Sequence, residues 1–330
     1  MTLEDTANGG TGANAPVDAS AVRQGGKSWW ERALDSDIFY SYSRSPVTIV
    51  ASIVTLAFFV GAIFAPWIAP YEPFNPASLN LMDGLVPPLS ESPFTGNYFF
   101  LGTDQQGRDI FSAILYGSRI SLLVAFSAVI LSMVLGVTLG LVAGYVGGWI
   151  DSLIMRIADI QLSFPGILVA LLIFGVARAV LPRDMQDDMA IYVLILAIGL
   201  SAWVQYARTV RGSAMVEKSK EYVQAARLIG LPAWVIMFRH VLPNVMGPVL
   251  VIATISLALA IISEATLSFL GVGVPPTQPS LGTLIRIGND FLFSGEWWMT
   301  LFPGIALVLL ALSVNLLGDW LRDALNPKLR

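Results

Sequence analysis

The strongest constraint on this chain is its set of long apolar runs with almost no charge. Residues 46–69 include no Asp, Glu, Lys or Arg, and a helix that crosses a bilayer needs about 20 apolar residues. Five similar runs follow, at 120–146, 160–180, 189–203, 245–268 and 301–317. The pattern predicts an all-α, polytopic membrane protein with six transmembrane helices.

The composition agrees with that class and argues against others. Of the 330 residues, 55% are hydrophobic and 13% are charged, about half the roughly 25% that is usual in a soluble domain. The net charge of -4 is small, whereas a chain that binds nucleic acid usually has a clear basic excess. We therefore expect membrane lipid, and no nucleic acid, among the partners of the chain.

The sequence offers few residues for catalysis or metal binding. It has no cysteine and one histidine, His240, so disulfides, thiolate nucleophiles and zinc sites with several histidine ligands are excluded within the chain. The Gly-Lys-Ser tripeptide at 26–28 lacks the glycine that a phosphate-binding loop carries five residues earlier, because Ala21 stands there. We therefore expect no catalytic site, no metal and no cofactor bound by this chain.

The distribution of basic residues predicts the orientation of the spans. Six spans put both termini on one side, and cytoplasmic segments carry an excess of Lys and Arg. Of the 19 basic residues, 14 fall in the two tails and in the connections after the second and fourth runs, and five fall in the other segments. Both termini are therefore expected in the cytoplasm.

This topology divides the chain into three parts. Residues 1–45 are a polar cytoplasmic tail, of which 1–27 is expected to be disordered, and residues 321–330 are a cytoplasmic C-terminal tail. Residues 46–320 form the transmembrane domain, with a large periplasmic loop at 70–116. Three glycines at spacing four, Gly136, Gly140 and Gly144, predict close approach between the second span and a neighbouring helix.

The cytoplasmic loop at 208–243 is the most informative segment. Its sequence predicts a helix over 217–229, with Tyr222, Ala225, Ala226 and Ile229 on one side. A Gly-Leu-Pro turn at 230–232 and a second helix at 233–241, ended by Leu242 and Pro243, are predicted next. Such a helix-turn-helix is shaped to fit a groove on a soluble protein. Its basic residues leave a second interpretation open, a helix that lies on the lipid surface.

This segment resembles the EAA loop of the permease subunits of ABC importers. The family pattern is Glu-Ala-Ala, three residues, Gly, nine residues, a hydrophobic residue, one further residue, and Leu-Pro. The matching positions of this chain are Gln224, Ala225, Ala226, Gly230, Leu242 and Pro243. Two positions depart from the pattern, since Gln224 replaces the glutamate and His240 stands where Ile is usual.

Two further stretches resemble signatures of the dipeptide/oligopeptide/nickel branch of that family. Residues 101–109 are similar to its G-T-D-x-x-G-R-D signature, and residues 267–282 are similar to its S-F-L-G…P-P…P-S…G signature. The R-H-x-L-P-N form at 239–244 looks like the same branch. Together the resemblance extends over residues 45–330, and the chain is most similar to the "C" member of the permease pair.

The resemblance implies the type I ABC importer permease fold and a larger assembly in a bacterial or archaeal plasma (inner) membrane. Its other members are a "B" permease, two ATPase subunits that bind ATP and Mg, and a periplasmic or lipid-anchored substrate-binding protein. It favours dipeptides or oligopeptides as substrates, while nickel chelates, glutathione and other small solutes remain alternatives. The residues alone also leave open a membrane scaffold or an intramembrane enzyme.

The resemblance also implies roles for individual residues of the cytoplasmic loop. Ala225, Ala226 and Gly230 are expected to give close seating on an ATPase subunit. Glu221 and Arg227 are candidates for polar contacts at the rim of that interface. Replacement of Gly230 by a bulky residue is therefore expected to uncouple ATP hydrolysis from uptake.

Three other groups are candidates for roles in the pathway or in delivery of substrate. The first is Ser163-Phe164-Pro165, a possible gate, although a packing role for Phe164 is equally open. The second is Glu264, which lies either in the membrane, as a pathway contact or proton relay, or at the interface. The third group, Asp104, Arg108 and Asp109, either contacts the binding protein or forms internal ion pairs that fold the loop.

Overall fold

The computed structural model describes residues 41–75, 77 and 79–325. The chain divides into two units, Met1–Ser45 and Pro46–Arg330. In the first unit, the described residues form a helical turn at 41–43 that ends where the Ser45 amide donates to the Tyr42 carbonyl at 3.2 Å. The predicted disorder of residues 1–27 lies outside the described residues.

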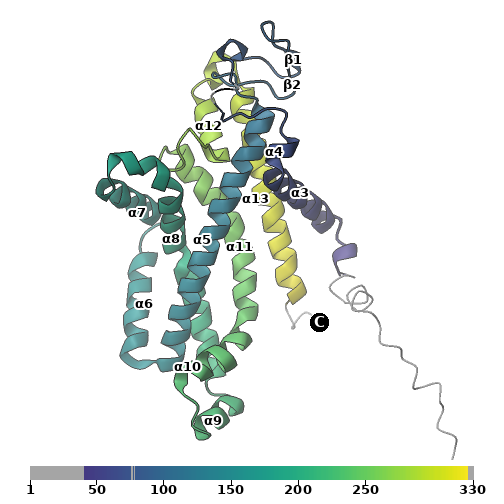
Figure 1. The fold of residues 1–330 in the computed structure, drawn as a ribbon. Helices are drawn as coiled ribbons and strands as arrows, with labels where there is room; N and C mark the ends of the chain where they lie inside the picture. Colours follow the sequence, from purple (N-terminus) through teal and green to yellow (C-terminus); the bar gives the residue numbers. More distant parts are fainter. Residues whose placement is uncertain (1–40, 76, 78, 326–330) are drawn as a thin grey trace, which may run out of the picture. The chain divides into compact units, whose positions relative to one another are not determined.

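The second unit is a bundle of long apolar helices (Figure 1). Within the described part, five helices are long and apolar enough to cross a membrane, and a bent pair makes up to six. The five contain α3 (Pro46–Ile63), α5 (Ile110–Val146), α8 (Gln186–Glu217), α11 (Leu242–Phe269) and α13 (Trp298–Leu325). The pair is α6 (Gly148–Leu162) and α7 (Gly166–Val180), which meet at 97°. The all-α membrane fold predicted from the apolar runs is confirmed.

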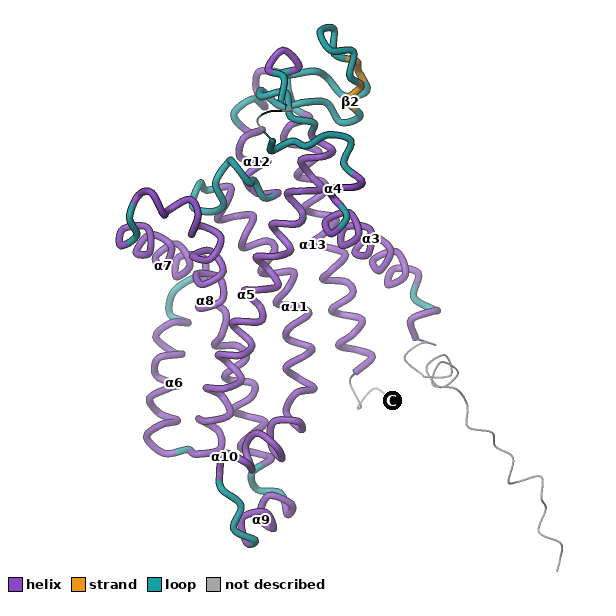
Figure 2. The backbone as a smooth tube through the Cα atoms, in the orientation of Figure 1, coloured by secondary structure: helices purple, strands orange, loops and turns teal. Residues whose placement is uncertain are grey.

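The shorter elements gather at the two ends of this bundle (Figure 2). One end, here called the cap, comprises residues 70–109 and 270–297. The cap contains η2 (Leu81–Asp83), β1 (Ser90–Glu91), β2 (Tyr98–Phe99), α12 (Leu281–Asn289) and η5 (Leu292–Ser294), with β1 and β2 antiparallel. The opposite end contains α9 (Glu221–Leu228), α10 (Ala233–Val235) and the π-helical segment η4 (Ile236–Val241). The remaining short helices are α4 (Ala65–Ile68) and η3 (Arg183–Met185).

The centre of the bundle is the contact between α5 and α8. A Cβ on Gly136, Gly140 or Gly144 would overlap backbone atoms of α8. At Gly144, for example, it would lie 2.6 Å from the carbonyl oxygen of Arg211. The prediction that these glycines allow close approach of a neighbouring helix is confirmed.

Several helix boundaries differ from the prediction. The single span predicted at 160–180 is wrong, because the chain breaks at 163–165 between α6 and α7. The helix predicted at 217–229 is also broken, since α8 ends at Glu217 and α9 begins at Glu221. Helix α5 begins at Ile110 and so occupies the last part of the segment expected to be a loop.

The predicted helix end at Leu242 and Pro243 is wrong as well. The chain continues as one helix from Ala233 to Phe269. A proline inside a helix removes one hydrogen bond and its ring clashes with the preceding turn. Here η4 widens that turn to the π form, which relaxes the i to i−4 spacing before Pro243. The helix therefore passes the proline without a break.

Candidate functional site

The first candidate site is α9, at the end of the bundle opposite the cap (Figure 1). Val223 and Ala226 are buried in an apolar cluster with residues of α5, α8 and α11. The other face carries Leu228, whose side chain is 88% exposed, and Ile229 follows at 75%. Ala225 is exposed on that side. The expectation that both alanines face a partner is therefore corrected, because Ala226 seats α9 on its own chain.

Gly230 ends α9 in the left-handed conformation, with φ of +81°. The Leu231 amide donates to the Ala226 carbonyl at 3.1 Å and the Gly230 amide to the Arg227 carbonyl at 3.0 Å, a glycine-dependent way to end a helix. A Cβ on Gly230 would meet no atom within 4 Å. The predicted turn is confirmed, and within this chain the glycine is needed for its backbone conformation and not for space.

Polar contacts join α9 to three long helices. The guanidinium of Arg227 lies 5.0 Å from the ring centroid of Tyr145 on α5, and its Nε donates to the Tyr145 hydroxyl at 3.3 Å. The Tyr222 hydroxyl donates to Glu217 at the end of α8 at 3.2 Å and accepts from Asn244 Nδ2 on α11 at 3.2 Å. Arg227 therefore contacts Tyr145 within the chain but is itself exposed, so its contact at the rim of a partner interface stays a prediction.

These contacts also determine the chemistry at this end of the bundle. Burial, followed by the nearby charge of Glu217, raises the pKa of Tyr222; a tyrosine hydroxyl is protonated at neutral pH even without this shift, so it is a hydrogen-bond donor there. Glu221 is exposed, as is Pro243, whereas Leu242 is half-buried beside the same apolar cluster. Tyr145 and Asn244 were missed from the sequence because their partners on α9 lie 82 and 22 positions away along the chain.

The second candidate site is the break between α6 and α7. Ser163 Oγ donates to the Asp159 carbonyl at 3.0 Å, and Pro165, with ψ of 131°, is the residue that precedes α7. Phe164 is exposed at the corner, at 59%, so most of its surface is free of contacts within the described chain. The end of α6 is fixed to α8 by Trp203, whose Nε1 donates to Gln161 Oε1 at 2.8 Å. The role of the break as a gate stays a prediction.

Two ion pairs join α6 to α8 on the N-terminal side of this break. Asp151 accepts from Arg211 on α8 at 2.5 and 2.7 Å, and Asp159 pairs with Arg208. Arg156, which lies between the two aspartates on α6, is exposed, and the partners of both aspartates come from α8. These pairs explain how charged residues are accommodated beyond Trp203, where the apolar run was expected to end.

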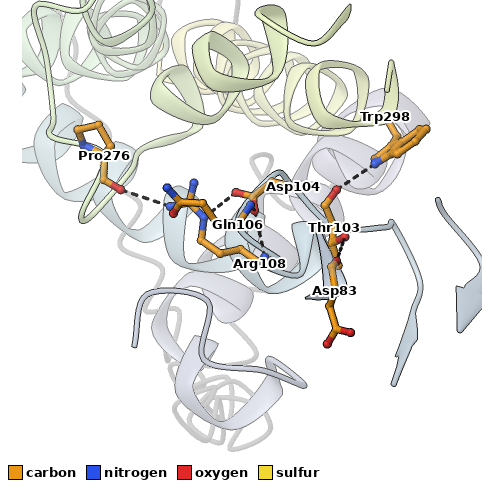
Figure 3. Close-up of polar contacts among 7 residues, drawn as sticks. All are labelled: Asp83, Thr103, Asp104, Gln106, Arg108, Pro276 and Trp298. Atoms are coloured by element: carbon orange, nitrogen blue, oxygen red, sulfur yellow. Dashed lines mark hydrogen bonds and ion pairs between the residues drawn. The ribbon is translucent and has the colours of Figure 1, made fainter. Parts of the chain in front are cut away.

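The third candidate site is the 101–109 stretch in the cap (Figure 3). Asp104 accepts from Arg108 Nε at 2.6 Å, and the Arg108 Nη1 donates to the Pro276 carbonyl at 3.4 Å. Thr103 Oγ1 donates to the Asp83 carbonyl, and the Thr103 carbonyl accepts from Trp298 Nε1 at 3.1 Å. The stretch therefore joins the two segments of the cap to each other and to the start of α13.

All three predicted residues of this stretch are buried. Asp109 caps α5, where its carboxylate accepts from the Ser112 amide at 2.8 Å and from the Ser112 hydroxyl at 2.6 Å. Burial raises the pKa of Asp109, against the opposing effect of these hydrogen bonds. The internal ion pair expected as an alternative is present between Asp104 and Arg108. Their burial does not support direct contact of these side chains with another protein.

Glu264 lies inside the bundle and is fully buried. Burial within the protein does not fix its depth in the membrane, so the choice between a membrane and an interfacial location stays a prediction. Its carboxylate oxygens accept from Ser121 on α5 and from Ser268 on α11, both at 2.7 Å. Among the described residues, no ion pair includes Glu264.

Comparisons with known proteins cover most of the chain. The family described as "Binding-protein-dependent transport system inner membrane component" matches residues 136–330, and the family described as "N-terminal TM domain of oligopeptide transport permease C" matches residues 35–88. The first of these segments extends from the middle of α5 to the C-terminus, and the second includes α3.

Curated relatives resemble the chain over nearly its whole length. It is 37% identical over 269 residues to the di/tripeptide transport system permease protein DppC of Pseudomonas aeruginosa, which covers 82% of this chain and 84% of that protein. It is 39% identical over 294 residues to the dipeptide transport system permease protein DppC of Escherichia coli K12, with coverage of 89% and 93%. A putative peptide transport system permease protein of Brucella suis is 38% identical over 281 residues, with coverage of 85% and 88%.

Proposed function

This chain belongs to the family of binding-protein-dependent transport system inner membrane components, and on that basis we propose that it is the C-type permease subunit of an ATP-driven peptide importer. The observation that carries the proposal is the similarity to di- and tripeptide permeases at 37–39% identity over 82% or more of the chain. The set of long apolar helices fits a subunit that forms part of a path through the inner membrane. The chain itself catalyses no reaction in this proposal.

The α9 end of the bundle is the docking site for an ATPase subunit. Leu228 and Ile229 are both largely exposed to solvent there. Full burial of a leucine or isoleucine side chain is worth about 1.5–3 kcal/mol, so a groove that covers both gains free energy that the isolated permease lacks. Gln224 and Ala225 lie beside them on the exposed side. An exposed helical face with two apolar anchors fits recognition of a helix in a groove.

The contacts of α9 within the chain supply the route of coupling. Arg227 holds α9 to Tyr145, and Tyr222 holds it to Glu217 and Asn244. A displacement of α9 by closure of the ATPase dimer therefore acts on α5, α8 and α11 together. ATP and Mg are bound by the ATPase subunits, and the free energy of their closure is passed to the permease through this one helix.

The two ends of the bundle and the break between α6 and α7 indicate where the remaining partners bind. With α9 in the cytoplasm, both termini are cytoplasmic and the cap faces a periplasmic or lipid-anchored binding protein. Helix α7 exposes Leu168, Leu172 and Val176 at spacing four. This stripe, with Phe164 at the corner, faces a second, B-type permease or the substrate path between the two subunits. Such an apolar path leaves the selection of substrate to the binding protein.

The test is reconstitution of the complex. A tag on this chain is expected to co-purify a second permease and two ATP-binding subunits, and proteoliposomes of that complex take up labelled dipeptide only with ATP and the binding protein. Binding assays on the cognate binding protein distinguish the substrates. A tight nickel chelate or glutathione ligand without peptide binding would reject the peptide assignment, and a chain that purifies alone and acts without ATP, as a scaffold or an intramembrane enzyme would, rejects the importer itself.

A further inference from the structure

A buried polar cluster lies where α5, α11 and the start of α12 meet, away from both α9 and the break between α6 and α7. At its centre is Glu264, whose side chain is fully enclosed. Its Oε2 accepts from Ser121 Oγ and its Oε1 accepts from Ser268 Oγ, both at 2.7 Å. The bond from Ser121 connects α11 to α5, whereas the bond from Ser268 lies within α11, one turn after Glu264.

Each of the two serines also bonds to the part of the cap that follows α11. Ser121 Oγ accepts from the backbone amide of Leu281, the first residue of α12, at 3.3 Å. Ser268 Oγ accepts from the backbone amide of Val274 at 3.5 Å. Val274 lies within the 270–280 loop, and Leu281 is the first residue after the loop. Glu264 therefore orients the two hydroxyls that accept from both sides of this loop.

Close backbone packing at the same place requires accurate placement of the loop. A Cβ on Gly282 would lie 2.6 Å from the Cα of Ala265, and a Cβ on Gly273 would lie 2.5 Å from the Cα of Ser268. A Cβ on Gly117 of α5 would lie 3.3 Å from the Leu281 amide nitrogen. A displacement of the loop by even one ångström would break the hydrogen bonds or create overlaps.

The free-energy balance indicates that a carboxyl group at this position has a specific role. A buried carboxyl in a membrane bundle is costly and is usually functional or paired. A leucine of similar size would fill the space without the cost of burying polar atoms. What a leucine lacks is the ability to accept two hydroxyl bonds at once, from Ser121 and Ser268.

We propose that Glu264 is a positioning residue that sets the place of the 270–280 loop and α12 on α5 and α11. Its role in transport rests on the proposed function, in which the cap faces the delivery protein. A correctly placed cap is needed for a loaded binding protein to stimulate ATP hydrolysis, whereas basal hydrolysis by the ATPase subunits does not require it.

The first test measures the position of the loop directly. The sequence has no cysteine, so Gln278→Cys in the loop and Val134→Cys on α5, both at exposed positions, give two sites for spin labels that are unique within this chain. The complex is prepared with partner subunits whose cysteines have been replaced. In the purified complex we expect one narrow distance distribution for the parent and for Glu264→Gln, which retains an acceptor oxygen. Glu264→Leu is expected to broaden the distribution or to shift its maximum.

The second test measures coupling in the same preparations. Glu264→Leu is expected to reduce stimulation of ATPase activity by peptide-loaded binding protein about ten-fold, since a buried hydroxyl left without its partner costs enough for that factor. Glu264→Gln is expected to stay within about three-fold of the parent. Ser118→Ala is the matched control, because the Ser118 hydroxyl is buried on α5 and donates to the Ile114 carbonyl of its own helix.

The outcomes separate this inference from the proposed function. A Glu264→Leu complex with the parental distance distribution and stimulation overturns the positioning role, and so does equal damage by Glu264→Gln and Glu264→Leu. If Glu264→Leu yields no assembled complex, the Ser121→Ala, Ser268→Ala double variant is expected to show the broadened distribution, and a parental distribution there overturns the inference. If Glu264→Leu broadens the distance distribution but the parent complex shows no stimulation of ATPase activity by binding protein, the positioning role is supported and the importer is rejected.

Discussion

Replacement of Gly140 by alanine is expected to separate α5 from α8 and to destabilise the bundle. The added Cβ would lie 2.9 Å from the Cα and 3.0 Å from the carbonyl carbon of Ala207, and it would overlap the Ala207 carbonyl oxygen. All three atoms belong to the backbone of α8, so no change of rotamer relieves the overlap. The two helices must move apart locally by several tenths of an ångström or more.

The expected magnitude follows from two opposing effects. Overpacking of a tightly packed interior costs about 1–3 kcal/mol. Alanine is favoured over glycine in a helix by up to about 1 kcal/mol, which offsets part of that cost. With the full offset, the net loss in free energy of unfolding is up to about 2 kcal/mol. Gly140→Leu adds side-chain overlap to the same backbone clash and is expected to prevent assembly.

The assay is thermal unfolding of the purified complex in detergent, with a matched control. The midpoint for Gly140→Ala is expected to fall by about 2–4 °C for each kcal/mol lost. Gly212→Ala on α8 is the control, because a Cβ there meets no atom within 4 Å. It is expected to leave the midpoint unchanged or to raise it. Equal midpoints for Gly140→Ala and Gly212→Ala would refute the close backbone contact between α5 and α8.

Three further predictions concern the two ends of the bundle. Leu228→Glu is expected to lower both co-purification of the ATPase and uptake at least about ten-fold. The control Leu89→Glu, at another exposed leucine in the cap, is expected to retain co-purification. Equal loss of co-purification in the two variants would refute α9 as the docking helix. Arg108→Ala leaves the buried Asp104 unpaired and is expected to lower the stability of the cap by about 3–5 kcal/mol. The loss is measured as faster proteolysis of the cap, and an unchanged proteolysis rate would contradict the role of Arg108 in joining the two segments of the cap. Gly230→Val is expected to lose more uptake than Gly230→Asn, because a branched residue at positive φ is strained by about 1–2 kcal/mol and asparagine tolerates that conformation. Equal uptake by the two variants would argue against a role for the backbone conformation of Gly230.

The number and type of the spans could be predicted because each apolar run carries its own signal. The ends of the helices could not be predicted in the same way. Helix α8 extends past Trp203 to Glu217 because Arg208 and Arg211 find partners on α6. Those pairs join residues 49 and 60 positions apart, so a local reading of hydropathy ends the span too early.

The face that α9 presents was predicted only in part. The sequence spacing grouped Ala225 with Ala226, but in the structure Val223 and Ala226 share the buried face and Leu228 lies opposite. Which face is buried depends on the packing of α9 against α5, α8 and α11, which the local spacing does not show. Nothing in the local pattern indicated that Arg227 stacks on Tyr145.

The environment of Glu264 could not be predicted from its neighbours in the sequence. Its polar neighbours in sequence, among them Ser263 and Thr266, suggested the end of a span. Its partner Ser121 lies 143 positions away, and only the tertiary fold brings the two together. The 267–282 stretch could be matched to a family signature, yet the reason for its serines and glycines became visible only in the packing of α12 against α11.

The unbroken helix from Ala233 to Phe269 has a mechanical consequence. Its 37 residues extend for about 55 Å at 1.5 Å per residue. It begins beside α9 and contains Glu264 in its last two turns. A tilt of about 5° at one end of such a rod displaces the other end by about 5 Å, which is comparable to the pitch of a helix. A single lever of this length joins a small rotation beside α9 and the seating of the cap in one movement, with the π-helical turn at Ile236–Val241 at its α9 end.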